Sequence, residues 1–520
     1  MASRSLKTFA PLSASGLLLM LGACQAGPDY APAPAMQRDP SAQSGWRTDL
    51  GAAKLDLGTA RVATWWTTLN DPSLTTLIGR AVSGNQSVTL ARLRLSESRA
   101  LRRGVAADGL PQINAAGDYD RNRSSETTGQ PINQSTRESG LDSYRAGFDA
   151  SWELDFFGRI SRNVEASDAQ IAESEALLAD ALVTLCADVG RQYVEIRSLQ
   201  ERLAIISRNI QFQTDAVGLA DARFNAGLTS ELDVSQARTL LDTSRAAVPT
   251  LEAALEIGIN RLGVLLGQDP ASLHAELSAP TPVPVAGSIA AAPIGKSAEM
   301  LMRRPDLRAA ERRIAAASAR IGVATADLYP RISLLGSIGV SSNNFSDAFD
   351  INSRFWSIGP SLRWNVFDGG RIRANINTLE QRERQAFVSY EQAVLKAIEE
   401  AESAIVSYAK SQQRRERLAT AVASSRRSVE VSELQYRAGN VGFLNVIEAQ
   451  RAQLALEDNL AEADRDATTN LISVYKAVGG GWEDWKVLDA SQQTQMQQPG
   501  SEPRGNVVLL APEGAPPRQP

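Results

Sequence analysis

The segment SYRAGFDASWELDFFGR, residues 143–159, alternates between two kinds of side chain. One set is apolar: Tyr144, Ala146, Phe148, Ala150, Trp152, Leu154 and Phe156. The set between them is mostly polar or charged: Ser143, Arg145, Asp149, Ser151, Glu153 and Asp155. Because successive side chains of a strand point to opposite faces, the alternation predicts a strand with one apolar and one polar face. A barrel strand between lipid and a wet lumen has this pattern, and so does a soluble sheet with one solvated face.

The same alternation returns later in the chain, in RFWSIGPSLRWNVFDGGR at residues 354–371. A shorter alternating run precedes each copy, so strands are predicted at about 112–157 and about 331–368, four in all. The segments inside each pair, about 122–142 and 341–353, are rich in Ser, Thr, Asn and Gln and are predicted to be exposed loops.

The chain also repeats itself over a long period. Residues 222–234 read ARFNAGLTSELDV and residues 434–446 read LQYRAGNVGFLNV, with Gly227 and Gly439 in matching positions. Two structural repeats are therefore predicted, 72–296 and 297–485. Each is expected to run helix, strands, long helix, glycine turn and return helix.

Long helices are predicted at 159–226 and 371–438, which contain no proline. At about 1.5 Å per residue each spans on the order of 100 Å, too long for a compact domain and typical of a coiled coil or tube. Return helices are predicted at 230–266 and 442–478. The summed length of 230–266 and a helix predicted near 297–329 roughly equals the length of one long helix, and the same holds for 442–478 and 72–107. Each pair is therefore expected to stack end to end beside a long helix, with its break at mid-height, where the connector 267–296 is expected.

The turns after the long helices carry clear signals. Gly227 and Gly439 stand where a left-handed residue ends a helix. Ser230 with Asp233 three residues later predicts a capping box. Gly442 fills the position that corresponds to Ser230 and offers no side-chain cap.

The N-terminus predicts export. Arg4 and Lys7 precede an apolar run, as in a secretory signal peptide, here residues 1–23. The sequence Leu21-Gly22-Ala23-Cys24 resembles a bacterial lipobox, which implies N-acyl and S-diacylglycerol groups on Cys24. Because Gln25 follows instead of aspartate, the resemblance implies sorting to the outer membrane. Residues 24–71 are expected to be an extended lipidated segment, and the tail 486–520, rich in Gln, Pro, Gly and Ser, to be disordered.

Composition excludes several classes of function. A formal net charge of −5 gives no reason to expect nucleic-acid binding. With one histidine and two cysteines, histidine triads and ordinary zinc sites are nearly excluded, and no glycine-rich phosphate loop is present. We therefore expect neither an enzyme nor a metal or cofactor site beyond the lipid.

Several ordered motifs carry a family resemblance: Cys24 with Gly27-Pro28-Asp29-Tyr30, Trp65-Trp66, Trp152 to Arg159, Arg303 to Glu311, and Ala319 to Ala324. Across residues 24–485 the chain resembles the outer-membrane factor family, the TolC-like efflux lipoproteins of the NodT and OprM type. The resemblance implies an α+β membrane protein and a homotrimer. Four strands per chain would form a twelve-stranded outer-membrane β-barrel, continued by an α-helical barrel through the periplasm.

The family's role is that of a passive conduit in tripartite multidrug efflux. Its partners would be a periplasmic adaptor (membrane fusion protein) and an inner-membrane pump of the resistance-nodulation-division (RND) type. A duct for type I protein secretion or for metal-ion efflux is the alternative. The few methionines and the single histidine disfavour soft metals.

By resemblance, the adaptor-facing tips are two turns: Asn225, Gly227, Ser230 and Leu232 in the first, and Arg437, Gly439, Gly442 and Leu444 in the second. Turn geometry alone would also explain the glycines. Asp221 and Glu433, at matching distances before the glycines, are candidates for acidic rings that narrow the pore. An ordinary solvated helix face would explain them as well.

Overall fold

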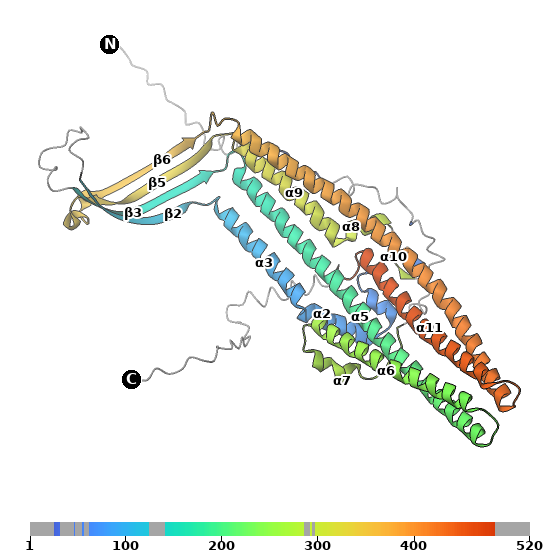
Figure 1. Ribbon diagram of the computed structural model, residues 1–520. Coiled ribbons are helices and arrows are strands. Elements are labelled where there is room, and N and C mark those ends of the chain that lie inside the picture. Colours follow the sequence, from blue (N-terminus) through green and yellow to red (C-terminus); the bar gives the residue numbers. More distant parts are fainter. Residues whose placement is uncertain are drawn as a thin grey trace, which may run out of the picture.

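The computed structural model describes residues 25–31, 46, 55–56, 62–123, 141–284, 292–293 and 297–483. The expected signal peptide, Cys24 and the expected tail 486–520 lie outside these residues. Figure 1 shows an elongated molecule with a curved sheet at one end and two helical hairpin tips at the other. Within the described parts, no helix is both long and apolar enough to span a bilayer.

The sheet has four antiparallel strands in the order β2-β3-β5-β6. Their bounds are Gln112–Asn122 for β2, Leu141–Leu154 for β3, Arg331–Ser342 for β5 and Arg354–Arg363 for β6. Both β3 and β6 end earlier than expected, so Phe156, Trp364 and Val366 lie beyond the strands. The expected loop 341–353 contains two 3-10 turns, η4 (Phe345–Asp347) and η5 (Ile351–Ser353).

The strand register gives the sheet two different faces. One row across the four strands is Ala115, Phe148, Ile338 and Trp356. The next row, on the opposite face, is Asn114, Asp149, Ser337 and Ser357. The alternation read from the sequence therefore describes a real apolar face and a real polar face.

Two helices of 67 residues run from the sheet to the tips, α5 (Arg159–Asn225) and α10 (Arg371–Arg437). Each starts after a left-handed glycine, Gly158 or Gly370. An aspartate accepts a hydrogen bond from an amide in each first turn, Asp155 from Ile160 at 3.0 Å and Asp368 from Ile372 at 2.8 Å. These caps satisfy amides that have no partner inside the helix.

Shorter helices cover the long ones. The return helices are α6 (Glu231–Leu266) and α11 (Phe443–Ala477), and near the sheet lie α3 (Gln86–Ala107) and α9 (Pro305–Ala326). Helix α5 packs along α3, α6, α9 and α11, and α10 packs along α9 and α11.

The expected pairing of the stacked helices is wrong. Helix α6 ends against the start of α3, where the Asn85 side chain donates to the carbonyl of Leu265 at 2.8 Å. Helix α11 ends against α9, where Arg304 donates to the carbonyl of Ala477 at 2.9 Å. Length alone fits either pairing, because α3 and α9 are both 22 residues long.

Both helices predicted near the sheet are also split. Stretch 72–107 breaks at Asn85 into α2 (Pro72–Gly84) and α3, and the Asn85 side chain caps the amides of Ser87 and Val88. Stretch 297–329 breaks before Pro305, which separates α8 (Ser297–Arg303) from α9. A proline is favoured in the first turn of a helix, where its missing amide costs nothing.

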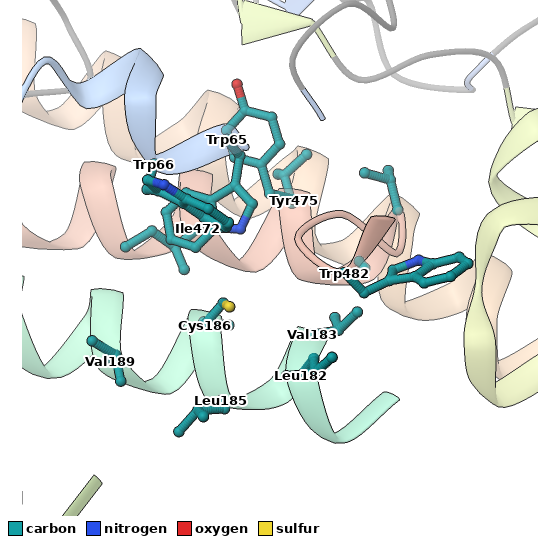
Figure 2. Close-up of a cluster of buried hydrophobic side chains, with 14 of the residues drawn as sticks. Trp65, Trp66, Leu182, Val183, Leu185, Cys186, Val189, Ile472, Tyr475 and Trp482 are labelled. Atoms are coloured by element: carbon teal, nitrogen blue, oxygen red, sulfur yellow. The ribbon is translucent and has the colours of Figure 1, made fainter. Parts of the chain in front are cut away.

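The main core lies at mid-height, where the chain segments around these breaks meet. Trp65, in the 3-10 helix η1 (Trp65–Leu69), stacks on Tyr475 with 5.8 Å between ring centroids and packs over Gly190 and Ile472. Figure 2 shows this cluster with Cys186 buried beside it. The remaining short elements are β1 (Leu55–Asp56), which pairs in parallel with β4 (Ala292–Pro293), η2 (Pro270–Leu273) and α7 (His274–Leu277).

Candidate functional site at the helix tips

The two turns farthest from the sheet share one backbone geometry. Gly227 has φ of 75° and Gly439 has φ of 78°. After the first glycine, the Leu228 amide donates to the carbonyl of Arg223 at 2.9 Å, and after the second, Asn440 donates to Gln435 at 2.9 Å. This six-residue closure needs a left-handed residue, which glycine adopts without strain. The prediction that both glycines end their helices is confirmed.

The predicted capping box at Ser230 is wrong. Ser230 does stand at the N-cap of α6, but its side chain makes no capping hydrogen bond. The hydroxyl of Thr229, one residue earlier, donates instead to the carboxylate of Asp233. Helix α11 also begins without a side-chain cap, at Gly442.

All eight residues predicted at the tips are exposed and lie in or beside these turns. The tips also present apolar side chains, with Leu228 67% exposed and Leu232 62% exposed on the first, and Leu444 54% exposed on the second. Exposed apolar groups gathered at one place mark interaction sites. Sequence reasoning missed Leu228, although a leucine directly after a turn glycine is a visible signal.

The two tips are packed together as one unit. The guanidinium of Arg223 lies 4.8 Å from the ring centroid of Tyr436 and donates to the Tyr436 carbonyl at 3.2 Å. Tyr436 packs on Phe443 with 5.0 Å between ring centroids. Burial raises the pKa of the Tyr436 hydroxyl, so this group is neutral near pH 7. The first tip is therefore held to the second by a stacked cation and a small apolar core.

The two candidate pore acids differ in their partners. Asp221 forms an ion pair with Arg238 at 3.1 Å on the same hairpin. Glu433 accepts a hydrogen bond from the neutral side chain of Gln450 at 3.2 Å. Arg238 and Gln450 follow their acids at the same spacing, so the two hairpins place a cation and an amide in equivalent positions. Of the two acids, Glu433 is the one whose partner does not neutralise it.

A second charged cluster lies at mid-height, where α9 meets α11. Arg304 binds Asp306 at 2.7 Å and Glu400 at 2.9 Å, beside a pocket of about 340 Å³ that Asp180 also lines. Burial, with a smaller effect of Asp306, raises the pKa of the Asp180 carboxyl. In the described chain, no three His, Cys, Asp or Glu side chains are grouped to hold a metal ion.

Comparisons with known proteins agree with this architecture. The family model "Outer membrane efflux protein" matches residues 77–268 and 297–480. The chain is 32% identical to the outer membrane protein OprJ of Pseudomonas aeruginosa, over 92% of this chain and 97% of that protein. It is 28% identical to the cation efflux system protein CusC of Escherichia coli O157:H7, over 81% of this chain and 89% of that one.

Solved structures show the same fold. The outer-membrane channel OprN is 36% identical to this chain and superposes with a TM-score of 0.79, over 88% of this chain and all of that one. Together, the matched residues and the shared fold place the chain in the outer membrane and give it the role of an efflux channel that extends into the periplasm. The chain belongs to the outer membrane efflux protein family.

Proposed function

We propose that three copies of this chain form one export duct, with a twelve-stranded barrel in the outer membrane and a helical barrel below it. The observation that carries the proposal is the order of the sheet, which leaves β2 and β6 at its two edges. Backbone groups inside a bilayer must all be paired, and known single-chain barrels begin at about eight strands. Pairing β6 of one copy with β2 of the next removes every edge.

The faces of the sheet support the same arrangement. The apolar face, which includes Phe148, Ile338 and Trp356, is exposed in the single chain and would contact lipid. At its foot the indole of Trp152 donates to Gly109 at 2.9 Å and that of Trp364 to Leu328 at 3.0 Å. Aromatic belts mark the edges of the hydrocarbon layer in barrels. These two tryptophans would therefore lie at the inner edge of the bilayer, and the helices that follow would extend into the periplasm.

Family membership supports the remaining parts of the proposal. We propose that signal peptidase removes residues 1–23 and that Cys24 carries N-acyl and S-diacylglycerol groups. At the tips, a periplasmic adaptor would cover the exposed apolar side chains and connect the duct to an inner-membrane RND pump. The duct itself would be a passive conduit without chemistry of its own.

Small-molecule drugs are the cargo that we propose. One relative, CusC, is described as a cation efflux system protein, so similarity alone does not choose between drugs and metal ions. The whole chain has six methionines and one histidine, too few to provide a series of soft ligands along the channel for copper or silver ions. Metal-ion efflux and type I protein secretion remain the competing outcomes of the test below.

Accumulation of a fluorescent dye and of antibiotics in a deletion strain tests this function. Wild-type protein should restore low accumulation, whereas a Leu228→Glu/Leu232→Glu variant should leave it near the level of the deletion strain. Burying an unpaired charge in an adaptor interface costs about 3 kcal/mol or more, enough to weaken docking by about a hundredfold. The matched control is Ile257→Glu on helix α6, which also carries Leu232, because Ile257 and Leu228 are both 67% exposed.

Trimer assembly is checked for every variant. Full activity of the Leu228→Glu/Leu232→Glu variant would contradict docking at the tips. If deletion changes the level of a secreted protein or of a metal ion, and of no drug, the fold assignment stands and the proposed cargo is wrong.

A further inference from the structure

Residues 25–31, the first described part of the chain, lie against both α5 and α9. The amide of Ala26 donates to the carbonyl of Phe157 at 3.1 Å, just before α5 begins. Gly27 has φ of 89°, and a Cβ added to it would lie 2.4 Å from the Cα of Gly322 in α9. A Cβ on Gly322 would in turn lie 3.0 Å from the Ala26 carbonyl oxygen. The segment and α9 therefore meet backbone to backbone, with no room for a side chain at either glycine.

The same segment partners buried charges on both helices. Arg162 of α5, with its side chain 3% exposed, binds Asp29 at 2.6 Å and donates to the Ala26 carbonyl at 3.3 Å, in addition to its ion pair with Glu165. Glu311 of α9, also 3% exposed, accepts a hydrogen bond from the Tyr30 hydroxyl. Buried charges are costly unless they are paired and hydrogen-bonded. Removing the segment would take partners away from two of them.

Arg312 completes the contact on α9. It forms an ion pair with Glu311, and its guanidinium lies 5.5 Å from the ring centroid of Tyr30. The tyrosine ring also packs on a small apolar cluster formed by alanines of α5 and α9. The segment is thus held by backbone, charged and aromatic contacts with α5 and α9.

The contacts of Gln25 determine where the N-terminal end of this segment lies. Gln25 rests on Gly158 at the start of α5, because a Cβ on Gly158 would lie 3.2 Å from the Gln25 Cα. Because neighbouring residues are covalently joined, the position of Gln25 restricts where the preceding chain can reach the helices. Phe156 and Tyr329 are both partly exposed at this end of the molecule, where the sheet meets the helices.

We propose that residues 25–31 are a clasp, built from protein contacts alone, that fixes the lipid-bearing Cys24 at the foot of the sheet. The acyl chains then enter the bilayer at the level of the interfacial aromatic side chains and beside the strand ends. The position of the lipid rests on the proposed lipidation and membrane orientation, whereas the clasp does not. The clasp also ties α5 of the first half of the chain to α9 of the second.

Hydrogen exchange of the peptide that covers residues 25–31, measured on the purified mature protein, tests the clasp. A Cys24→Ser variant, exported with an ordinary cleavable signal peptide in place of residues 1–23, carries no lipid and should exchange as slowly as wild type. Gly27→Ala should exchange at least about tenfold faster, because local opening then becomes much easier. The matched control is Gly104→Ala, since a Cβ there meets nothing within 4 Å.

Tyr30→Phe provides a second route to the same result and leaves the backbone contacts untouched. It removes the hydroxyl that Glu311 accepts from, so its exchange rate should fall between those of wild type and Gly27→Ala. Fast exchange in Cys24→Ser would overturn the proposal, because the lipid would then hold the segment. Wild-type rates in both Gly27→Ala and Tyr30→Phe would overturn it too.

Failure of the proposed function would look different. The intact mass of the wild-type protein reports whether acyl groups are present, and a mass without them would contradict the lipid position and leave the exchange result on the clasp standing. Dye accumulation reports on the duct and does not depend on the exchange rate of residues 25–31.

Discussion

Replacing Arg304 by methionine should destabilise the protein by about 2–3 kcal/mol, less than the full cost of stranding a buried charge, because both carboxylate partners are more than a third exposed. The Arg304 side chain is 10% exposed and binds Asp306, Glu400 and the last carbonyl of α11 at Ala477. The variant would leave two carboxylates and a helix end without their cation at the joint where α9 continues α11. Denaturant unfolding of the purified protein, followed by helical circular dichroism, measures the loss.

The pH dependence of this loss has a defined sign. Because burial raises the pKa of Asp180 in the folded protein, its protonated form favours folding, and that stability is lost as the pH rises. Without the nearby Arg304 cation, the charged form becomes still less favourable at neutral pH. The loss in free energy of unfolding caused by Arg304→Met should therefore become smaller as the pH falls toward about 4, the ordinary range of an aspartate pKa.

Arg313→Met is the control for this variant. Arg313 also lies on α9 and pairs with Glu173 across to α5 at 2.6 Å, but its side chain is 53% exposed. An exposed pair of this kind contributes about 0–1 kcal/mol. Equal losses from Arg304→Met and Arg313→Met would contradict the role assigned to the joint.

Trp65→Ala should cost about 3–5 kcal/mol, since it removes one of the largest buried side chains of the mid-height core. Trp65 is 1% exposed, stacks on Tyr475, and leaves so little space that a Cβ on Gly190 would lie 2.7 Å from its ring. The same unfolding experiment measures the effect. Trp65→Phe keeps an aromatic ring for the stack and should recover part of the loss.

A surface aromatic provides the comparison for Trp65. Phe349 is 80% exposed, so Phe349→Ala should leave the unfolding midpoint of the helical body nearly unchanged. A Trp65→Ala protein as stable as wild type would show that the mid-height cluster does not hold the helices together.

The sequence predicted the parts of the fold that depend on local pattern. Alternation in residues 143–157 described both faces of the sheet, and the glycine turns and long proline-free stretches located the hairpins. Helix stacking was mispredicted because α3 and α9 have equal lengths, and only tertiary contacts at Asn85 and Arg304 distinguish their partners. The break at Asn85 follows a glycine, which is a visible signal, but its cap also depends on the distant carbonyl of Leu265.

At the candidate site, the sequence predicted the positions of the turns and failed to predict the side-chain partners. Turn residues follow from sequence spacing, so both tips were located correctly in the chain. The partners of Asp221 and Glu433 lie on the neighbouring helix of each hairpin and depend on how the helices rotate against each other, which periodicity does not define. Ser230 lost its predicted cap because the Asp233 amide, from which its hydroxyl oxygen would accept, donates to the Ser230 backbone carbonyl at 3.1 Å, while the Asp233 carboxylate accepts from Thr229.

Disulfide cross-linking between the edge strands of neighbouring copies tests most directly whether three copies share one barrel. Asn114→Cys on β2 would be combined in turn with Ser357→Cys and Ser361→Cys on β6, all on the polar face of the sheet. The native Cys186 is buried and gives little background. After oxidation in the membrane, we predict covalent dimers and trimers in at least one pair, nothing larger, and none of these species from the single-cysteine variants. Species beyond the trimer, or no cross-linking in any pair, would contradict a closed barrel made from three chains.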